Sequence, residues 1–204
     1  IVFYSSMPPL DIPITVPSIV LAILSELLFG LAIGVILQVA FNAITFAGGL
    51  ISFMMGFSMA SAIDPQTGVS MPIISQFLSL MGLMVLLAID LHHWLLLFID
   101  GSLSSVPLGG FLMTEDLFNY MIKATSNMFL VGFMIAFPII AITFLQDIIF
   151  GMLMKTMPQF NLLVIGFPIK IMFAFLVLIA TFSATMLILK TQMIEAFNYL
   201  EMFF

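Results

Sequence analysis

The chain has no cysteine and no arginine, and few of its 204 residues carry a charge. The absence of cysteine excludes disulfide bonds and thiolate metal sites. Four lysines stand against ten acidic residues, and this balance argues against binding to nucleic acid or anionic lipid, because both need clustered cations. Charged residues make up 7% of the chain, against about 25% in soluble domains. The composition therefore predicts a protein that lies in a membrane.

One uncharged run is longer than a membrane span requires. Residues 27–63 contain no charged side chain. At about 1.5 Å per residue, a helix over that stretch would be about 55 Å long, whereas the hydrocarbon core of a bilayer is about 30 Å thick. We therefore expect part of this run to do something other than cross the membrane.

Proline and glycine mark the first boundaries. Residues 1–16 hold three prolines and are expected to form an extended lead-in, because proline disfavours helix at its own position and before it. A first helix is predicted from Pro17 to about Gly49. Residues 55–71 contain turn-forming glycines and an Asp-Pro pair in an apolar context. They predict a hydrophobic loop between helices.

The rest of the chain is expected to be helical as well. A second apolar segment runs from about 72 to 98, and a break is predicted over 100–110. Thr114, followed by two acidic residues, is a typical N-cap. It should start a long helix with a kink at Pro138. The fold class predicted is all-α: a helix pair with a loop, then a hairpin of two long helices, roughly 117–157 and 168–200.

Asp90, His92 and His93 form the single cluster in the sequence that resembles a metal or proton site. Asp90 and His93 would share a helix face, but adjacent histidines are expected to point about 100° apart. One carboxylate and one imidazole are too few for a closed metal site. A metal site and a proton relay stay open, and a hydrogen bond at the membrane boundary or between subunits is favoured.

Glu26 and Asp147 are isolated acids in apolar helices. An ionisable residue at membrane depth is a functional candidate; alternatively, each is neutralised, or is paired with a backbone amide or a partner subunit. The sequence shows no Ser/His/Asp set, phosphate-binding loop or pair of carboxylates at catalytic spacing. We therefore expect neither an enzyme nor a bound cofactor.

Methionine and phenylalanine are abundant, with 18 and 23 copies. Methionine adapts to irregular apolar surfaces. Several of these residues surround the loop glycine, Gly56: Phe53, Met54, Met55, Phe57, Met59 and Met71. Such a loop could close a wide pore and deform around a passing chain, or it could serve plain packing.

Two stretches together resemble a known family. The stretch SELLFGLAIGVILQVAFNAITFAGGLISFMMGFSMASAIDPQTGVSMP is similar to the FliR family of flagellar type III export gates, whose injectisome counterpart is SctT (SpaR). The matching positions are Glu26, Gly30, Gly34, Met55-Gly56, Asp64-Pro65 and Met71-Pro72. The stretch KTMPQFNLLVIGFPIK matches a second family motif at Pro158, Gln159, Asn161, Gly166, Phe167 and Pro168, which we expect at the turn of the long hairpin.

The resemblance implies a protein-conducting gate in the bacterial inner membrane, at the flagellar basal body and largely on its periplasmic side. One copy of such a chain assembles with FliP and FliQ into a closed ring, with an FlhB-type switch protein nearby and unfolded export substrates passing through. It also implies a FliP-like half over 17–110 and a FliQ-like half over 111–204. The family places a loop like 55–71 in the pore as a plug.

The chain departs from the family pattern in two ways. Family members have further hydrophobic sequence before the point that matches residue 1, and they carry a basic residue between the first-half helices that is absent here. The runner-up interpretation is the injectisome gate subunit. A transporter of small solutes or protons that uses Glu26, Asp90 and Asp147 is the rival from another class, and a passive scaffold is a third possibility.

Overall fold

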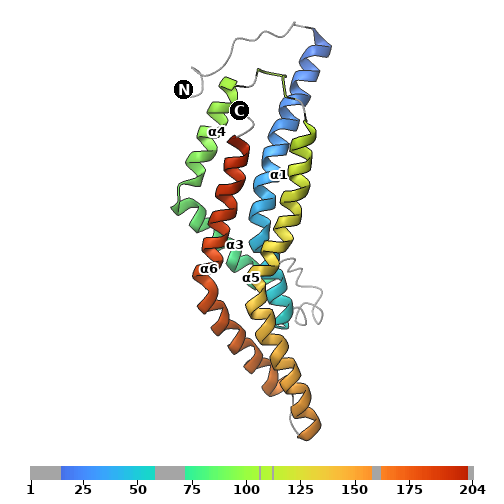
Figure 1. Ribbon diagram of the computed structural model, residues 1–204, viewed down its shortest axis with the longest axis vertical. Coiled ribbons are helices and arrows are strands. Elements are labelled where there is room, and N and C mark those ends of the chain that lie inside the picture. Colours follow the sequence, from blue (N-terminus) through green and yellow to red (C-terminus); the bar gives the residue numbers. More distant parts are fainter. Residues whose placement is uncertain (1–14, 58–71, 106, 112, 158–161, 202–204) are drawn as a thin grey trace. The chain divides into compact units, whose positions relative to one another are not determined.

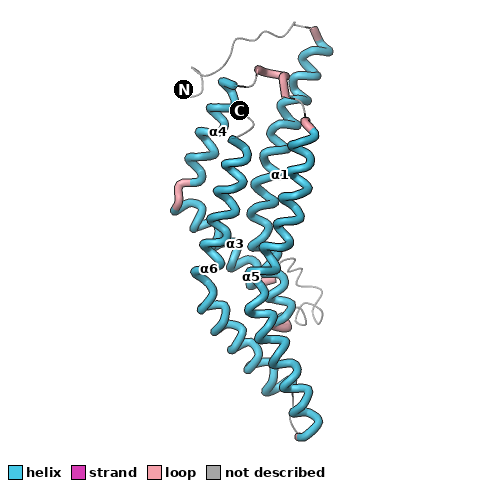
Figure 2. Tube along the Cα trace, in the orientation of Figure 1, coloured by secondary structure: helices cyan, strands magenta, loops and turns pink. Residues whose placement is uncertain are grey.

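The computed structural model describes residues 15–57, 72–105, 107–111, 113–157 and 162–201. Every regular element in these ranges is a helix, as Figure 2 shows. In chain order the elements are α1 (Val16–Met54), α3 (Ile73–Ala88), α4 (Leu91–Ser105), α5 (Glu115–Thr156), η3 (Leu162–Gly166) and α6 (Phe167–Glu201), labelled in Figure 1. The all-α prediction is confirmed.

Most predicted boundaries are confirmed to within a few residues. The first helix extends five residues beyond Gly49, to Met54. Thr114 is the N-cap of α5, because its Oγ1 accepts a hydrogen bond from the Leu117 amide at 3.3 Å. The helix continues through Pro138, and a kink there stays a prediction.

The second apolar segment differs from its prediction. It is not one helix but two, α3 and α4, with a break at Ile89 and Asp90. Asp90 has φ 58°, a left-handed conformation that aspartate adopts more readily than most residues. Its amide donates to the Leu87 carbonyl, so the end of α3 is closed by a turn.

The predicted break over 100–110 is wrong in its first half. Helix α4 continues to Ser105, and Ser102 bonds its hydroxyl to the Ile99 carbonyl within the helix. The turn comes later, where the Gly110 amide donates to the Pro107 carbonyl. Isolated glycine and serine residues lower helix propensity without forbidding a helix.

The last helix begins one residue earlier than expected. A π-helical turn, η3, leads directly into α6 at Phe167. Pro168 lies in the first turn of α6, where its missing amide hydrogen costs nothing.

Two compact units can be distinguished. The first consists of residues 1–41, 84–127 and 190–204, and the second of residues 42–83 and 128–189. Both units combine helices from the two halves of the sequence. The FliP-like and FliQ-like division over 17–110 and 111–204 stays a prediction.

The first unit has an apolar core built from four helices. The N-terminal part of α1 contributes Ala32 and Ile36, α4 contributes Phe98, α5 contributes Leu117, and α6 contributes Ala196 and Leu200. Figure 1 shows α4 beside the C-terminal end of α6. Tyr120 and Tyr199 stack in parallel next to this core, with ring centroids 3.2 Å apart.

The second unit has a seam of small and polar residues between α1 and α3. Ser75 of α3 donates to the Thr45 carbonyl of α1 at 2.7 Å, and the hydroxyls of Thr45 and Ser79 lie 3.0 Å apart. A Cβ added to Gly48 would lie 2.5 Å from the Ser75 Cα. Inside a bilayer the hydrophobic effect does not drive helices together, so close backbone packing and hydrogen bonds from hydroxyl groups stabilise the contact between them.

Candidate functional site

The end of α1 carries the described part of the expected plug. The backbone turns at Gly56, which has φ +86°, a value that glycine adopts without strain. The Gly56 amide donates to the Phe53 carbonyl at 3.0 Å. Met55 is fully buried, whereas Phe53 is 66% exposed. The turn therefore holds one methionine in the core and leaves a phenylalanine on the surface.

The structure brings the two family-like motifs together. A Cβ added to Gly56 would lie 2.7 Å from Cε1 of Phe167, the residue between Gly166 and Pro168 at the start of α6. The Phe167 ring thus packs against the bare face of Gly56. The sequence predicted each motif but not this contact.

Several predicted residues lie outside the described part of the chain. Met59, Asp64, Pro65 and Met71 of the expected plug belong to this group, as do Pro158, Gln159 and Asn161 of the expected hairpin turn. Met54 and Phe57 are described and half-buried. The predicted plug role of residues 55–71 stays a prediction.

Asp147 is paired with a residue that the sequence analysis missed. Both carboxylate oxygens accept from Lys170 Nζ, at 2.7 and 2.8 Å. The Lys170 side chain is 12% exposed and that of Asp147 is 53% exposed. The ion pair links α5 to α6 inside two apolar helices, where an unpaired charge would be costly.

Glu26 is bonded to the backbone, one of the alternatives that the sequence left open. Its Oε1 accepts from the Gly109 amide at 2.9 Å, and Ser25 next to it donates to the Phe111 carbonyl at 3.1 Å. Glu26 also lines an apolar cavity of about 390 Å³ between α1 and the segment from Leu95 to Leu108. These contacts tie the turn before α5 to α1.

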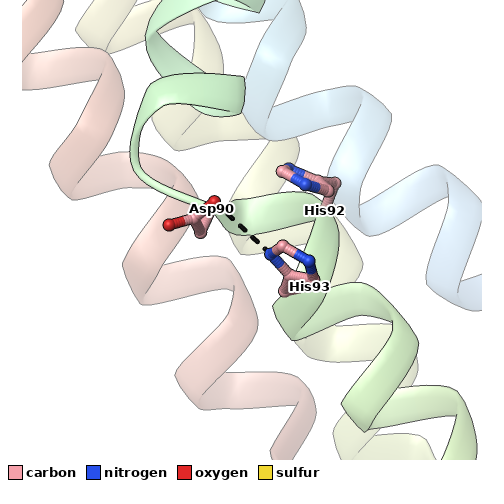
Figure 3. A group of neighbouring side chains, drawn as sticks. All are labelled: Asp90, His92 and His93. Carbon is pink, nitrogen blue, oxygen red and sulfur yellow. Dashed lines mark ion pairs between the residues drawn. The ribbon is translucent and has the colours of Figure 1, made fainter.

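Asp90, His92 and His93 lie together and exposed at the start of α4 (Figure 3). Asp90 Oδ1 lies 3.3 Å from His93 Nδ1. The two imidazole rings are also neighbours, with centroids 4.2 Å apart, although we expected adjacent histidines to diverge. Trp94, which follows them, is 44% exposed.

The helices define the class of protein. In the described ranges, α1, α5 and α6 are long and apolar enough to cross a membrane, and α3 with α4 adds a fourth span if the broken pair counts as one. Only 11% of the most apolar stretch of α1 is buried within the chain. These features are those of a helical membrane protein whose apolar faces meet lipid or other subunits.

Comparison with known proteins identifies the family. The family model described as "Bacterial export proteins, family 1" matches residues 1–196. The chain is 36% identical to the flagellar biosynthetic protein FliR of Bacillus subtilis over 168 residues, which cover 81% of the chain and 65% of that relative. It is 32% identical to FliR of Escherichia coli over 183 residues, which cover 87% of the chain and 70% of that relative. The chain belongs to the FliR family of bacterial export proteins.

Proposed function

We propose that this chain is a subunit of the flagellar type III export gate and helps form the pore through which unfolded flagellar subunits cross the inner membrane. Membership in the FliR family is the observation that carries the proposal. One copy would join FliP and FliQ subunits in a ring, mostly on the periplasmic side, with an FlhB-type protein as neighbour. The large exposed apolar surface of α1, α5 and α6 supports burial against such subunits.

Within that gate, we propose that the segment from Met55 to Met71 seals the pore. Three features support this role. Met55 is a buried anchor, the backbone turns at Gly56 directly after α1 ends, and the segment contains the deformable thioethers of Met55, Met59 and Met71. An export substrate would displace the seal and occupy the space it leaves.

Deletion within residues 57–70 tests the seal. With the gate closed, we expect the deletion to raise ion leakage across the inner membrane, because the apolar barrier becomes thinner. The measurement is membrane conductance, or growth under ionic stress, in cells that produce the whole gate. A matched variant, Met59→Leu/Met71→Leu, keeps the apolar volume and should stay tight. Equal, low leakage from the deletion and the matched variant, in gates shown to assemble, would contradict the seal.

Neutralising Glu26 separates the gate from a proton-coupled transporter. Glutamine keeps an oxygen that can accept from the Gly109 amide. We therefore expect cells that produce Glu26→Gln to swim at nearly the normal rate. Glu26→Leu removes the acceptor and should lower the stability of the chain by about 1 kcal/mol. Less of the chain should then assemble into the gate. Swimming assays in a strain without its own FliR measure both variants. Loss of motility in Glu26→Gln with normal assembly would favour the transporter, and failure of the unaltered chain to restore motility would favour the injectisome gate.

A further inference from the structure

All the imidazole groups of this chain lie at one place. The sequence holds two histidines and no cysteine, and both histidines belong to the cluster with Asp90 at the start of α4. Imidazole nitrogen favours zinc, copper and nickel, whereas magnesium and calcium prefer oxygen ligands. Both imidazole groups of the chain, which are the ligands that suit zinc, therefore lie at the bend between α3 and α4.

The geometry of the cluster suits a small coordination sphere. One ligand atom from each residue lies within 4.8 Å of the others. In a tetrahedral zinc site with bonds of about 2.0–2.2 Å, neighbouring ligand atoms lie about 3.3–3.6 Å apart. The Asp90 Oδ1 to His93 Nδ1 distance, 3.3 Å, already meets this value. His92 needs a shift of about 1.5 Å at most, and its exposed side chain is free to rotate by that amount.

The backbone of the bend presents all three side chains from one turn. The Asp90 carbonyl accepts from the amides of His93 and Trp94, at 2.9 and 3.4 Å. Asp90 is thus joined to the first turn of α4 while its left-handed backbone closes α3. Figure 3 shows the three side chains grouped beside this turn. The partner that the structure gives the Asp90 carboxylate is His93 rather than a lysine.

We propose that Asp90, His92 and His93 bind a divalent transition metal ion, with zinc as the expected ion. The metal lies between Asp90 Oδ1 and His93 Nδ1, and His92 completes a set of two nitrogens and one oxygen. A set of this kind leaves one tetrahedral position for water. Because Asp90 belongs to the bend and both histidines to α4, the ion stiffens the junction between the two helices.

Metal titration of the whole chain tests the site. The protein is purified in detergent with an affinity tag free of histidine, and Zn²⁺ or Co²⁺ is added while calorimetry or the visible bands of Co²⁺ report binding. We expect one saturable ion per chain and no competition from Mg²⁺. The double variant His92→Gln/His93→Gln should abolish saturable binding. Asp90→Asn should lower affinity by at least the roughly tenfold loss that even outer-shell partners cause.

Glu201→Gln is the matched control, because it removes an exposed carboxylate at the end of α6 and should bind metal normally. Hyperfine coupling to nitrogen in the electron paramagnetic resonance spectrum of the Cu²⁺-loaded protein gives a second readout that needs no variant. Absence of saturable binding, binding that survives the double histidine variant, or a Cu²⁺ spectrum without nitrogen coupling would each overturn the proposal.

Discussion

Replacing Gly48 by alanine is expected to lower the melting temperature of the purified protein by about 2–12 °C. The new Cβ would lie 2.5 Å from the Ser75 Cα and 2.9 Å from the Ser75 backbone nitrogen. Backbone atoms cannot rotate away, so α3 must move back from α1. That movement also stretches the bond from Ser75 to the Thr45 carbonyl. Overpacking of this kind costs about 1–3 kcal/mol, and each kcal/mol shifts the melting temperature of a chain of this size by about 2–4 °C.

Gly49 supplies the control for this experiment at the adjacent position. Nothing lies within 4 Å of a Cβ added there, so Gly49→Ala should leave the melting temperature unchanged or raise it slightly, because alanine favours helix by about 1 kcal/mol. The measurement is the fraction of monodisperse protein that survives heating, read by size-exclusion chromatography. Equal melting temperatures for the two variants would show that α1 and α3 do not approach as closely as the structure has them.

Helices were predictable from this sequence because their signals are local. The N-cap at Thr114 and the start of the last helix near Pro168 both follow from the conformations that single residues prefer. The break at Asp90 was missed because an apolar run on both sides of it masks a single left-handed residue. The extension of α4 to Ser105 could not be predicted, because the glycine and serine residues there are weak helix formers that are also common in breaks.

Side-chain partners were less predictable, because they depend on which helix faces meet. Asp147 lies on α5, whereas its partner, Lys170, lies on the next long helix, α6. Glu26 reaches the amide of Gly109, far along the chain. Segments that are apolar on all sides give little information about their packing faces, so neither pairing can be read from spacing.

Replacing one member of the ion pair between Asp147 and Lys170 is expected to lower the stability of the protein more than replacing both. Asp147→Leu leaves Lys170 unpaired, and that side chain is only 12% exposed, so a loss of about 1.5–3 kcal/mol is expected, the range for a hydrogen bond to a charged group. Lys170→Met leaves the more exposed Asp147 carboxylate alone among apolar helices and should cost less. The double variant Asp147→Leu/Lys170→Met buries no charge and should recover most of the stability.

A double-mutant cycle measures this coupling, with thermal stability in detergent and the yield of assembled gate as readouts. Lys155→Met is the control, since it removes an exposed lysine from α5 in the same unit and should have little effect. A double variant as unstable as the worse single one would mean that Asp147 and Lys170 act on separate partners. Recovery of stability without recovery of motility would instead assign the pair a part in export, because packing of α5 against α6 would then be intact while the charges were missing.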